Sequence, residues 1–289
     1  MSKYYKTKEN VVFDTIVNLV MIFTLLVCFL PFVYMAALSF SSSKAIINNQ
    51  VLFWPVGFNL DAYKQIFTYP NFFQAYGNTF IYTIGGTTIA MLMTIMFAYP
   101  LSKDNLMGHK VFMKIVVISM FFAGGMIPNY ILMVSLGLRD TVASFILPGM
   151  ISTYYVILMR SFFLTLPREL EEAGEIDGLD KWGVFWRIAI PLSKPIIATM
   201  TLFYVVQYWN DWFDAFLYLD TTTKWPVAYY LRQLISSASG TSADAGDAMQ
   251  IASNIKSCAM VLTSAPIICI YPFIQKYFVQ GMMLGGVKG

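Results

Sequence analysis

The sequence predicts an all-α membrane protein with six transmembrane helices, and three observations carry this prediction. Of the 289 residues, 57% are hydrophobic and only 12% are charged, which is about half the charged share of soluble domains. The chain also holds 24 Phe and 18 Tyr, as expected for a helix bundle with aromatic belts at the membrane surfaces. Finally, the apolar residues form six runs, each long enough to cross a hydrocarbon core of about 30 Å as a helix.

Six apolar runs define the predicted spans. They cover residues 11–38, 72–101, 111–135, 142–164, 195–219 and 257–280. The first run is too long for the apolar part of a cleavable signal peptide, so we interpret it as a transmembrane helix that is retained. The chain, 1–289, is then one transmembrane domain, with its two longer polar connections near 39–71 and 220–256.

The basic residues predict the orientation of these spans. If the N-terminus is cytoplasmic, roughly two thirds of the 19 Lys and Arg residues fall on the inner side of the membrane. Cytoplasmic loops of membrane proteins carry the excess of Lys and Arg. Both termini are therefore predicted to be cytoplasmic, and so is the connection near 165–194.

Several classes of site are excluded by what the sequence lacks. The three cysteines lie in apolar runs without paired spacing, which predicts packing residues and not a disulfide framework or a zinc site. The single histidine, His109, rules out an HExxH metal motif and is interpreted as a solvated loop residue. The sequence has no GxxxxGK[ST] phosphate-binding loop and no GxSxG motif. We therefore predict no catalytic residue, no metal site and no nucleic-acid partner.

The connection between the fourth and fifth spans carries signals for two short helices. Pro167 suits a first helical turn, and Gly178 suits a left-handed turn that ends the first helix. Asp180 can cap a second helix that runs from Lys181 to Ile190. Connections in helix bundles usually have about 2–8 residues, whereas this one is far longer. We therefore favour a protruding docking hairpin over the alternative, a solvated linker.

The same connection resembles the EAA loop of ABC-importer permeases. The matching positions are Glu172-Ala173-Gly174, Gly178, Ile188 and Ile190-Pro191. Further stretches fit the carbohydrate-uptake branch of that family: Pro191 to Pro195, Asn78-Thr79, Gly125 to Tyr130, Trp209 to Trp212 and Gln275 to Gly281. The GGMIPNY stretch resembles the subgroup that handles oligosaccharides or polysaccharide fragments. Two residues depart from the pattern, since Gly174 replaces the second Ala of the motif and Leu179 replaces a small residue.

This resemblance implies a permease subunit of an ATP-driven importer in the bacterial cytoplasmic (inner) membrane. It implies four kinds of partner: a second homologous permease, two cytoplasmic ATPase subunits that bind ATP and Mg, an extracytoplasmic solute-binding protein, and the sugar. No cofactor is expected on this chain. The loop at about 167–191 would form a coupling-helix hairpin that docks on an ATPase. The coupling residues implied are Glu172, Ala173, Gly174, Asp177, Gly178 and Phe185.

A candidate substrate path follows from polar residues within the spans. Tyr204, Tyr208 and Asp211 follow one another at helical spacing in the fifth span. Asn78 and Tyr82 form a weaker pair in the second span. Acidic residues within membranes usually face a cavity and mark function, and hydroxyl, amide and carboxylate groups can bind sugar hydroxyls. The alternative is a set of hydrogen bonds that hold the bundle together, and for Asn78 this alternative is favoured.

A second class of function remains open at this point. An ion-coupled secondary transporter would usually show ionisable residues near the membrane midplane and two recognisable repeats. The sequence shows neither feature. A membrane enzyme would need a catalytic cluster, and none is present in the sequence. The importer is therefore the favoured interpretation.

Overall fold

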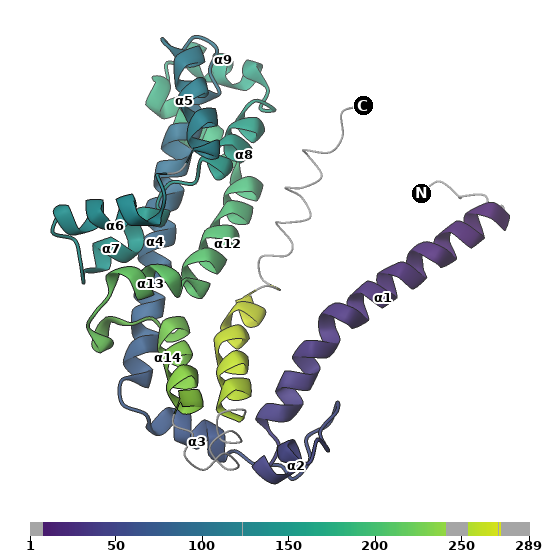
Figure 1. The fold of residues 1–289 in the computed structure, drawn as a ribbon. Helices are drawn as coiled ribbons and strands as arrows, with labels where there is room; N and C mark the ends of the chain where they lie inside the picture. Colours follow the sequence, from purple (N-terminus) through teal and green to yellow (C-terminus); the bar gives the residue numbers. More distant parts are fainter. Residues whose placement is uncertain (1–7, 123, 241–253, 271, 273–289) are drawn as a thin grey trace. The chain divides into compact units, whose positions relative to one another are not determined.

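The computed structural model describes residues 8–122, 124–240, 254–270 and 272, and these residues form helices, turns and loops (Figure 1). The chain divides into two compact units. The first comprises Met1–Tyr69 with Gln233–Ser264, and the second comprises Pro70–Arg232 with Ala265–Gly289. The predicted all-α fold class is confirmed within the described residues.

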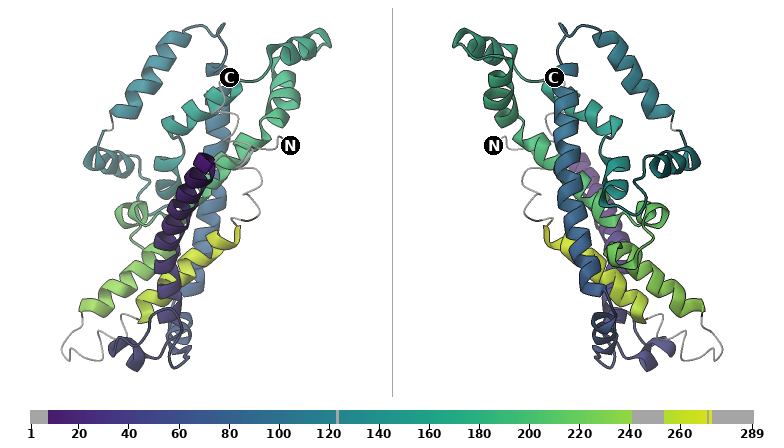
Figure 2. Two further views of the ribbon diagram at one scale, coloured as in Figure 1. Left: turned by 90° about the vertical axis from the view of Figure 1, so that its right-hand side faces the viewer. Right: turned by 90° about the vertical axis from the view of Figure 1, so that its left-hand side faces the viewer.

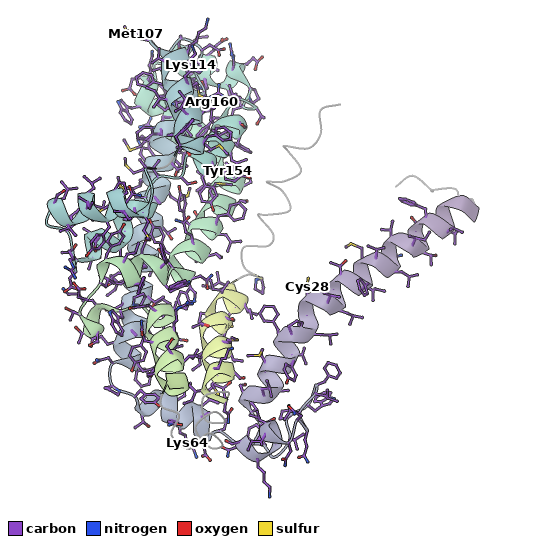
Figure 3. The ribbon with its side chains drawn as sticks, viewed as in Figure 1. Cys28, Lys64, Met107, Lys114, Tyr154 and Arg160 are labelled. Carbon is purple, nitrogen blue, oxygen red and sulfur yellow. The ribbon has the colours of Figure 1, made fainter. Side chains whose placement is uncertain are left out.

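The first unit is built around the long apolar helix α1 (Lys8–Ser39). Most large side chains along this helix are exposed (Figure 3), as expected for a surface that faces lipid or another subunit. Its C-terminal end is tied to two other elements. Tyr63 on α3 (Asp61–Thr68) donates a hydrogen bond to Ser39 Oγ over 2.9 Å. The thiol of Cys258 on the helix Asn254–Ile270 donates to the Ser39 carbonyl over 3.4 Å.

Helix α4 (Phe72–Leu101) is the axis of the second unit. Helices α8 (Thr153–Phe163) and α12 (Lys194–Asn210) both pack against it. Ala90 and Ala98 are completely buried along α4, and such small side chains allow membrane helices to approach closely. Two views of the unit show α4 running past the other helices, with α5 and the 167–191 segment near the same end (Figure 2).

The remaining elements of the two units are short. They are α2 (Ser43–Ile47), α5 (His109–Phe121), α6 (Met126–Ser135), α7 (Val142–Ile146), η1 (Leu147–Gly149), α9 (Arg168–Ile176), α10 (Lys181–Val184), η2 (Phe185–Ala189), α11 (Ile190–Leu192), α13 (Phe213–Tyr218), η3 (Thr222–Lys224) and α14 (Val227–Gly240).

The predicted first and second spans are single helices, whereas the third, fourth and fifth are interrupted. The third is interrupted between α5, which ends at Phe121, and α6, which begins at Met126 directly after Gly125 with φ +91°. The fourth bends by 51° between η1 and α8. The fifth ends as a helix at Asn210 and resumes at Phe213. The apolar length of these three runs therefore does not indicate an uninterrupted helix, because hydropathy measures apolar length and not backbone continuity.

The length of the helices sets a lower and an upper bound on the number of membrane crossings. Within the described residues, α1 and α4 alone are long and apolar enough to cross a membrane, and up to five crossings result if each bent pair of helices is one span. The helix Asn254–Ile270 covers the beginning of the predicted sixth span. The end of that span, and the resembling stretch at 275–281, lie outside the described residues.

Candidate coupling hairpin and transport residues

The segment 167–191 forms two helical arms joined at Gly178. Arm one is α9, which begins directly after Pro167. Gly178 has φ +85°, a conformation that costs other residues steric strain. Arm two begins at Lys181 and continues through a π-helical turn to Leu192. Asp180 accepts a hydrogen bond from the Gly183 amide over 2.7 Å, so the predicted cap is confirmed.

Gly174, one of the two departures from the family pattern, lies directly against the second arm of the hairpin. A Cβ at Gly174 would lie 2.4 Å from Ile188 Cδ1 and 3.4 Å from Leu179 Cδ1. Ile188 and Leu179 thus fill the space between the arms that an alanine side chain would otherwise enter. The interior of the hairpin is packed by larger residues from the second arm and the turn, and glycine on the first arm makes room for them.

The predicted coupling residues divide into two groups in the structure. Glu172, Ala173, Asp177 and Gly178 are exposed on the first arm and the turn, whereas Gly174 and Phe185 are buried. Phe185 is only 4% exposed, and its ring centroid lies 4.8 Å from that of Tyr99 on α4. In this structure Phe185 therefore joins the hairpin to the bundle, and its predicted contact with an ATPase stays a prediction.

The outer surface of the hairpin carries apolar side chains that the sequence reasoning missed. Ile176 is 86% exposed, Trp182 is 61% exposed and Trp186 is 53% exposed. The sequence did contain a signal for this contact surface, namely large apolar residues within a polar, charged segment. A solvated linker would be expected to carry polar residues at such exposed positions. Large apolar side chains exposed among polar residues are typical of a protein–protein contact.

Ion pairs join the first arm of the hairpin to the end of α4 and the loop that follows it. Lys103 Nζ lies 2.5 Å from the Glu171 carboxylate, with both side chains largely shielded from solvent. Lys103 Nζ also lies 4.4 Å from the centre of the Tyr99 ring. A more exposed pair joins Arg168 to Asp104. We call these contacts the hairpin brace, because they connect the hairpin to the longest helix of the unit.

The tyrosines of the predicted substrate path are in the core of the second unit. Tyr204 is fully buried, and its hydroxyl shares a hydrogen bond with Thr94 over 2.7 Å. Tyr208 is 1% exposed and donates to the Ile146 carbonyl over 3.0 Å. These bonds agree with the alternative in which the residues hold the bundle together. Their place on a substrate path stays a prediction.

Two further predicted path residues, Asn78 and Tyr82, also bond within the chain. Asn78 donates to the carbonyls of Thr223 and Trp225 over 2.7 and 3.2 Å, and Tyr82 donates to the carbonyl of Lys224 over 2.8 Å. Both side chains thus fasten the segment after α13 to α4, as the favoured alternative for Asn78 expected.

Asp211 occupies the break between α12 and α13. Its Oδ1 accepts hydrogen bonds from the amides of Phe213 and Asp214, each over 3.1 Å. The prediction placed Asp211 within a continuous helix, whereas it stands at the start of a new one. Its carboxylate caps that helix, because unpaired amides at a helix N-terminus favour an anionic acceptor.

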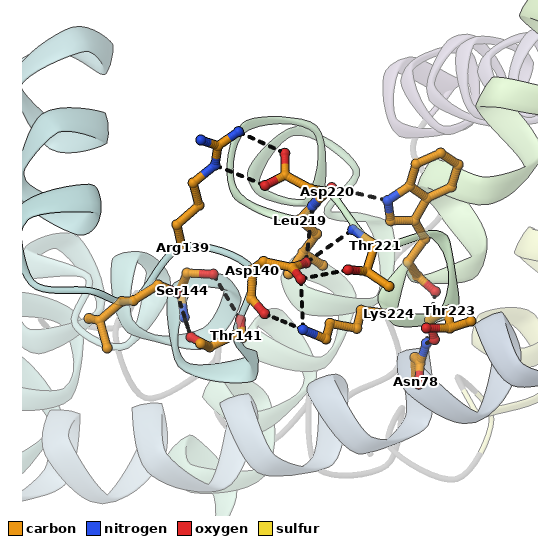
Figure 4. Close-up of polar contacts among 12 residues, drawn as sticks. Asn78, Arg139, Asp140, Thr141, Ser144, Leu219, Asp220, Thr221, Thr223 and Lys224 are labelled. Carbon is orange, nitrogen blue, oxygen red and sulfur yellow. Dashed lines mark hydrogen bonds and ion pairs between the residues drawn. The ribbon is translucent and has the colours of Figure 1, made fainter.

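A polar cluster joins the loop after α6 to the segment after α13 (Figure 4). Asp140 accepts hydrogen bonds from the amides of Asp220 and Thr221, each over 3.1 Å, and from Lys224 Nζ over 2.7 Å. Arg139 pairs with Asp220 at 2.8 Å. Partial burial raises the pKa of the Asp140 carboxyl, but hydrogen bonds from Lys224 and Thr221 and the Lys224 charge outweigh it and hold this pKa well below its ordinary value.

This cluster, which we call the loop clasp, was not predicted. Its charged residues lie in two polar connections, near 136–141 and 220–256, and no pattern in the sequence indicates a contact between them. Asp140, whose φ is +56°, places its carboxylate against a segment some 80 residues away in the chain. Among the described residues, no group of His, Cys, Asp or Glu side chains is arranged to hold a metal ion.

Comparison with known proteins assigns the family. The chain is 43% identical to Protein LplC of Bacillus subtilis (strain 168) over 289 residues, covering 99% of this chain and 98% of that protein. It is 37% identical to the polygalacturonan/rhamnogalacturonan transport system permease protein YtcP of the same organism, covering 97% of this chain and 100% of that protein. No family model matches the chain.

A solved structure is similar over almost the whole chain. It is a bacterial ABC transporter involved in the import of the acidic polysaccharide alginate, with 30% identity, a TM-score of 0.84, and coverage of 96% of this chain and 100% of that one. Together with the relatives, this match shows that the chain belongs to the permease subunits of ABC transporters that import sugars and oligosaccharides. It is thus a multi-pass membrane subunit of a transporter, and the predicted family is confirmed.

Proposed function

We propose that this chain is one of two homologous permease subunits that form the translocation path for oligosaccharides or polysaccharide fragments. Both termini lie in the cytoplasm, and an extracytoplasmic solute-binding protein delivers the sugar to the opposite face. Two cytoplasmic ATPases bind ATP and Mg and supply the energy. The relatives that transport polygalacturonan, rhamnogalacturonan and alginate support this class of cargo.

The hairpin at 167–191 is the proposed point of coupling. The observation that carries this assignment is its exposed apolar side chains, chiefly Ile176 and Trp186, on an otherwise polar segment. Glu172 and Asp177 are exposed on the first arm and the turn. An ATPase cleft that accepts such a hairpin would bury apolar area and hold the charges at its rim.

The hairpin brace supplies a physical route from the ATPase to the bundle. Phe185 packs on Tyr99, and Lys103 pairs with Glu171, so movement of the hairpin pulls on the end of α4. Because α8 and α12 pack along α4, these helices move with it as one body. Rigid-body movement of packed helices is a common form of switching between two states.

Uptake of radiolabelled oligosaccharide into ATP-loaded vesicles tests the coupling assignment. The double variant Glu172→Ala, Gly178→Val should abolish uptake and reduce co-purification of the ATPase, because it removes a rim charge and distorts the turn. A matched control, Glu169→Ala, changes a charge in the same helix outside the proposed coupling set and should retain uptake. Full uptake by the double variant would refute the coupling role.

The alternative function, an ion-coupled secondary transporter, predicts a different result. Such a protein would transport sugar in vesicles that contain this chain and its partner permease without any ATPase, driven by an ion gradient. The importer requires the ATPases and ATP, and an ionophore should leave its uptake unchanged. Uptake that collapses with the ionophore and persists without ATP would establish the alternative.

A further inference from the structure

A mostly apolar cavity of about 320 Å³ lies between the C-terminal end of α4 and the second arm of the hairpin. Met96, Tyr99 and Pro100 line it from α4, and Lys181, Trp182 and Phe185 line it from the hairpin. We call it the interfacial cavity. Its volume is about twice that of a cavity of about 150 Å³ that accommodates benzene, so it can take a short stretch of an alkyl chain.

The interfacial cavity lies where a membrane helix ends. Helix α4 is one of the two described helices that are long and apolar enough to cross a membrane by themselves. Its last residue is Leu101, and charged residues follow at Lys103 and Asp104. This is the level at which hydrocarbon gives way to lipid headgroups. Trp182, which is 61% exposed at the cavity, is a residue type that prefers this level.

The charges at the cavity favour an anion. Its lining includes two lysines, and none of the lining residues, all of which the structure describes, is acidic. Lys103 is neutralised by Glu171 at 2.5 Å. Lys181 is exposed, and within the described part of the chain it forms no ion pair. Lys181 thus places a positive charge at the cavity and lacks an acidic partner there.

We propose that the interfacial cavity binds one anionic phospholipid. The phosphate interacts with Lys181, the glycerol region lies against Trp182, and part of one acyl chain packs on Met96, Pro100 and Phe185. A basic pocket beside the end of a transmembrane helix on the cytoplasmic side is a typical site for an acidic headgroup. The assignment to the cytoplasmic leaflet rests on the orientation in the proposed function. The bound lipid then fills the space between the coupling hairpin and α4.

Quenching by brominated lipids tests this proposal on the complete transporter. The complex is placed in nanodiscs of phosphatidylcholine that contain either brominated phosphatidylglycerol or brominated phosphatidylcholine. The emission of Trp182, one of six tryptophans, is isolated as the difference between the complex and its Trp182→Phe variant. Brominated phosphatidylglycerol should quench this emission at clearly lower mole fractions than brominated phosphatidylcholine.

Charge variants identify the residue that selects the headgroup. Lys181→Gln should weaken the preference for phosphatidylglycerol about fivefold, the effect expected for one lysine near an anionic lipid. Lys110→Gln removes an exposed lysine from the same side of the membrane that does not line the cavity, and should keep the preference. Native mass spectrometry of lipids retained by the unmodified complex gives a second measurement that needs no variant.

Three results would overturn the lipid site. The first is equal quenching of Trp182 by the two lipids. The second is an unchanged preference for phosphatidylglycerol in Lys181→Gln. The third is quenching that occurs only when the ATPases are removed, which would show that an ATPase, and not a lipid, occupies the interfacial cavity. Sugar uptake is measured on the same preparations. Normal ATP-driven uptake without a lipid preference refutes this proposal alone, whereas a lipid preference without ATP-driven uptake refutes only the proposed function.

Discussion

Gly174 shows how a single residue sets the distance between the two arms of the hairpin. Because a Cβ there would lie 2.4 Å from Ile188 Cδ1, Gly174→Ala forces the end of a flexible side chain to move. We expect a loss of about 1 kcal/mol, at the lower end of the range for overpacking. Thermal unfolding of the assembled complex measures this loss.

Shortening the opposing side chain, Ile188, provides the control for the Gly174→Ala variant. The double variant Gly174→Ala, Ile188→Val removes the methyl group that clashes and should recover most of the stability. If the double variant is less stable than Gly174→Ala alone, the contact between these residues does not explain the glycine.

Asp180 is the second residue whose role can be measured locally. Asp180→Ala removes the acceptor for the Gly183 amide, and loss of such a cap costs about 1 kcal/mol. Hydrogen exchange of peptides covering 180–192 should become faster. Asp180→Ser keeps a capping oxygen and should exchange like the unaltered protein. Equal exchange in the alanine and serine variants would show that the cap is unimportant.

At the scale of elements, we expect the hairpin brace to make α4 and the hairpin move together. Lys103→Glu and Glu171→Lys each place like charges together in a largely shielded site, and each should lower ATP-driven uptake severalfold. The exchanged pair, Lys103→Glu with Glu171→Lys, restores the attraction and should recover part of the uptake. Asp104→Asn breaks the exposed pair with Arg168, and exposed pairs contribute little, so it should change uptake only slightly. Equal defects in the exchanged pair and the single variants would contradict the brace.

The loop clasp predicts a specific dependence of stability on pH. The pKa of Asp140 is lowered in the folded state, so its ionised form contributes stability at all pH values above its unfolded pKa of about 3.9. This contribution disappears as the pH falls below that value toward the folded pKa. Asp140→Asn should therefore be less stable by about 2 kcal/mol near neutral pH, since it weakens hydrogen bonds to a charged group.

Melting temperatures of the complex in nanodiscs at several pH values measure this effect. The difference between Asp140→Asn and the unaltered protein should stay constant from neutral pH to about pH 5 and should shrink below about pH 4. Asp220→Asn breaks the more exposed pair with Arg139 and should produce a smaller difference. A difference for Asp140→Asn that is the same at pH 3 and pH 7 would contradict a role for its charge.

At the scale of the whole molecule, the orientation in the membrane decides which face meets the ATPases. In a variant without Cys28, Cys258 and Cys269, single cysteines at Lys181 and Thr222 should react with an impermeant maleimide from opposite sides. In intact cells Thr222→Cys should react, and Lys181→Cys should react only after the cells are opened. Reaction of both from outside would place the hairpin on the wrong side for coupling.

The hairpin could be predicted in detail because its signals are local. Pro167, Gly178 and Asp180 act through the backbone conformation and capping of their immediate neighbours, so sequence spacing alone located both arms. The buried position of Phe185 could not be predicted, since it depends on Tyr99, which comes from a different helix. The exposed tryptophans could be read from the sequence as large apolar residues, but their exposure required the packing of the second arm.

The environment of the candidate path residues, in contrast, could not be predicted, because their partners are distant in the sequence. Tyr204 and Tyr208 were predicted to share one face of a helix that lines a substrate path, whereas their hydroxyl partners come from α4 and α7. Asp211 was assigned to the helical face of the fifth span because apolar residues surround it in the sequence. The carboxylate instead caps a new helix. A hydropathy pattern cannot distinguish a carboxylate on a continuous helix from one that caps the start of a new helix.

The sequence by itself determined the membrane character, the all-helical class, the family and the two-armed hairpin, because hydropathy, capping and turn chemistry act over a few residues. Only the tertiary structure decided where three apolar runs break, which polar groups are bonded within the chain, and how the brace, the clasp and the interfacial cavity are formed. Each of these features joins residues far apart in the chain. Their energies depend on distances and burial that exist only after the helices have packed.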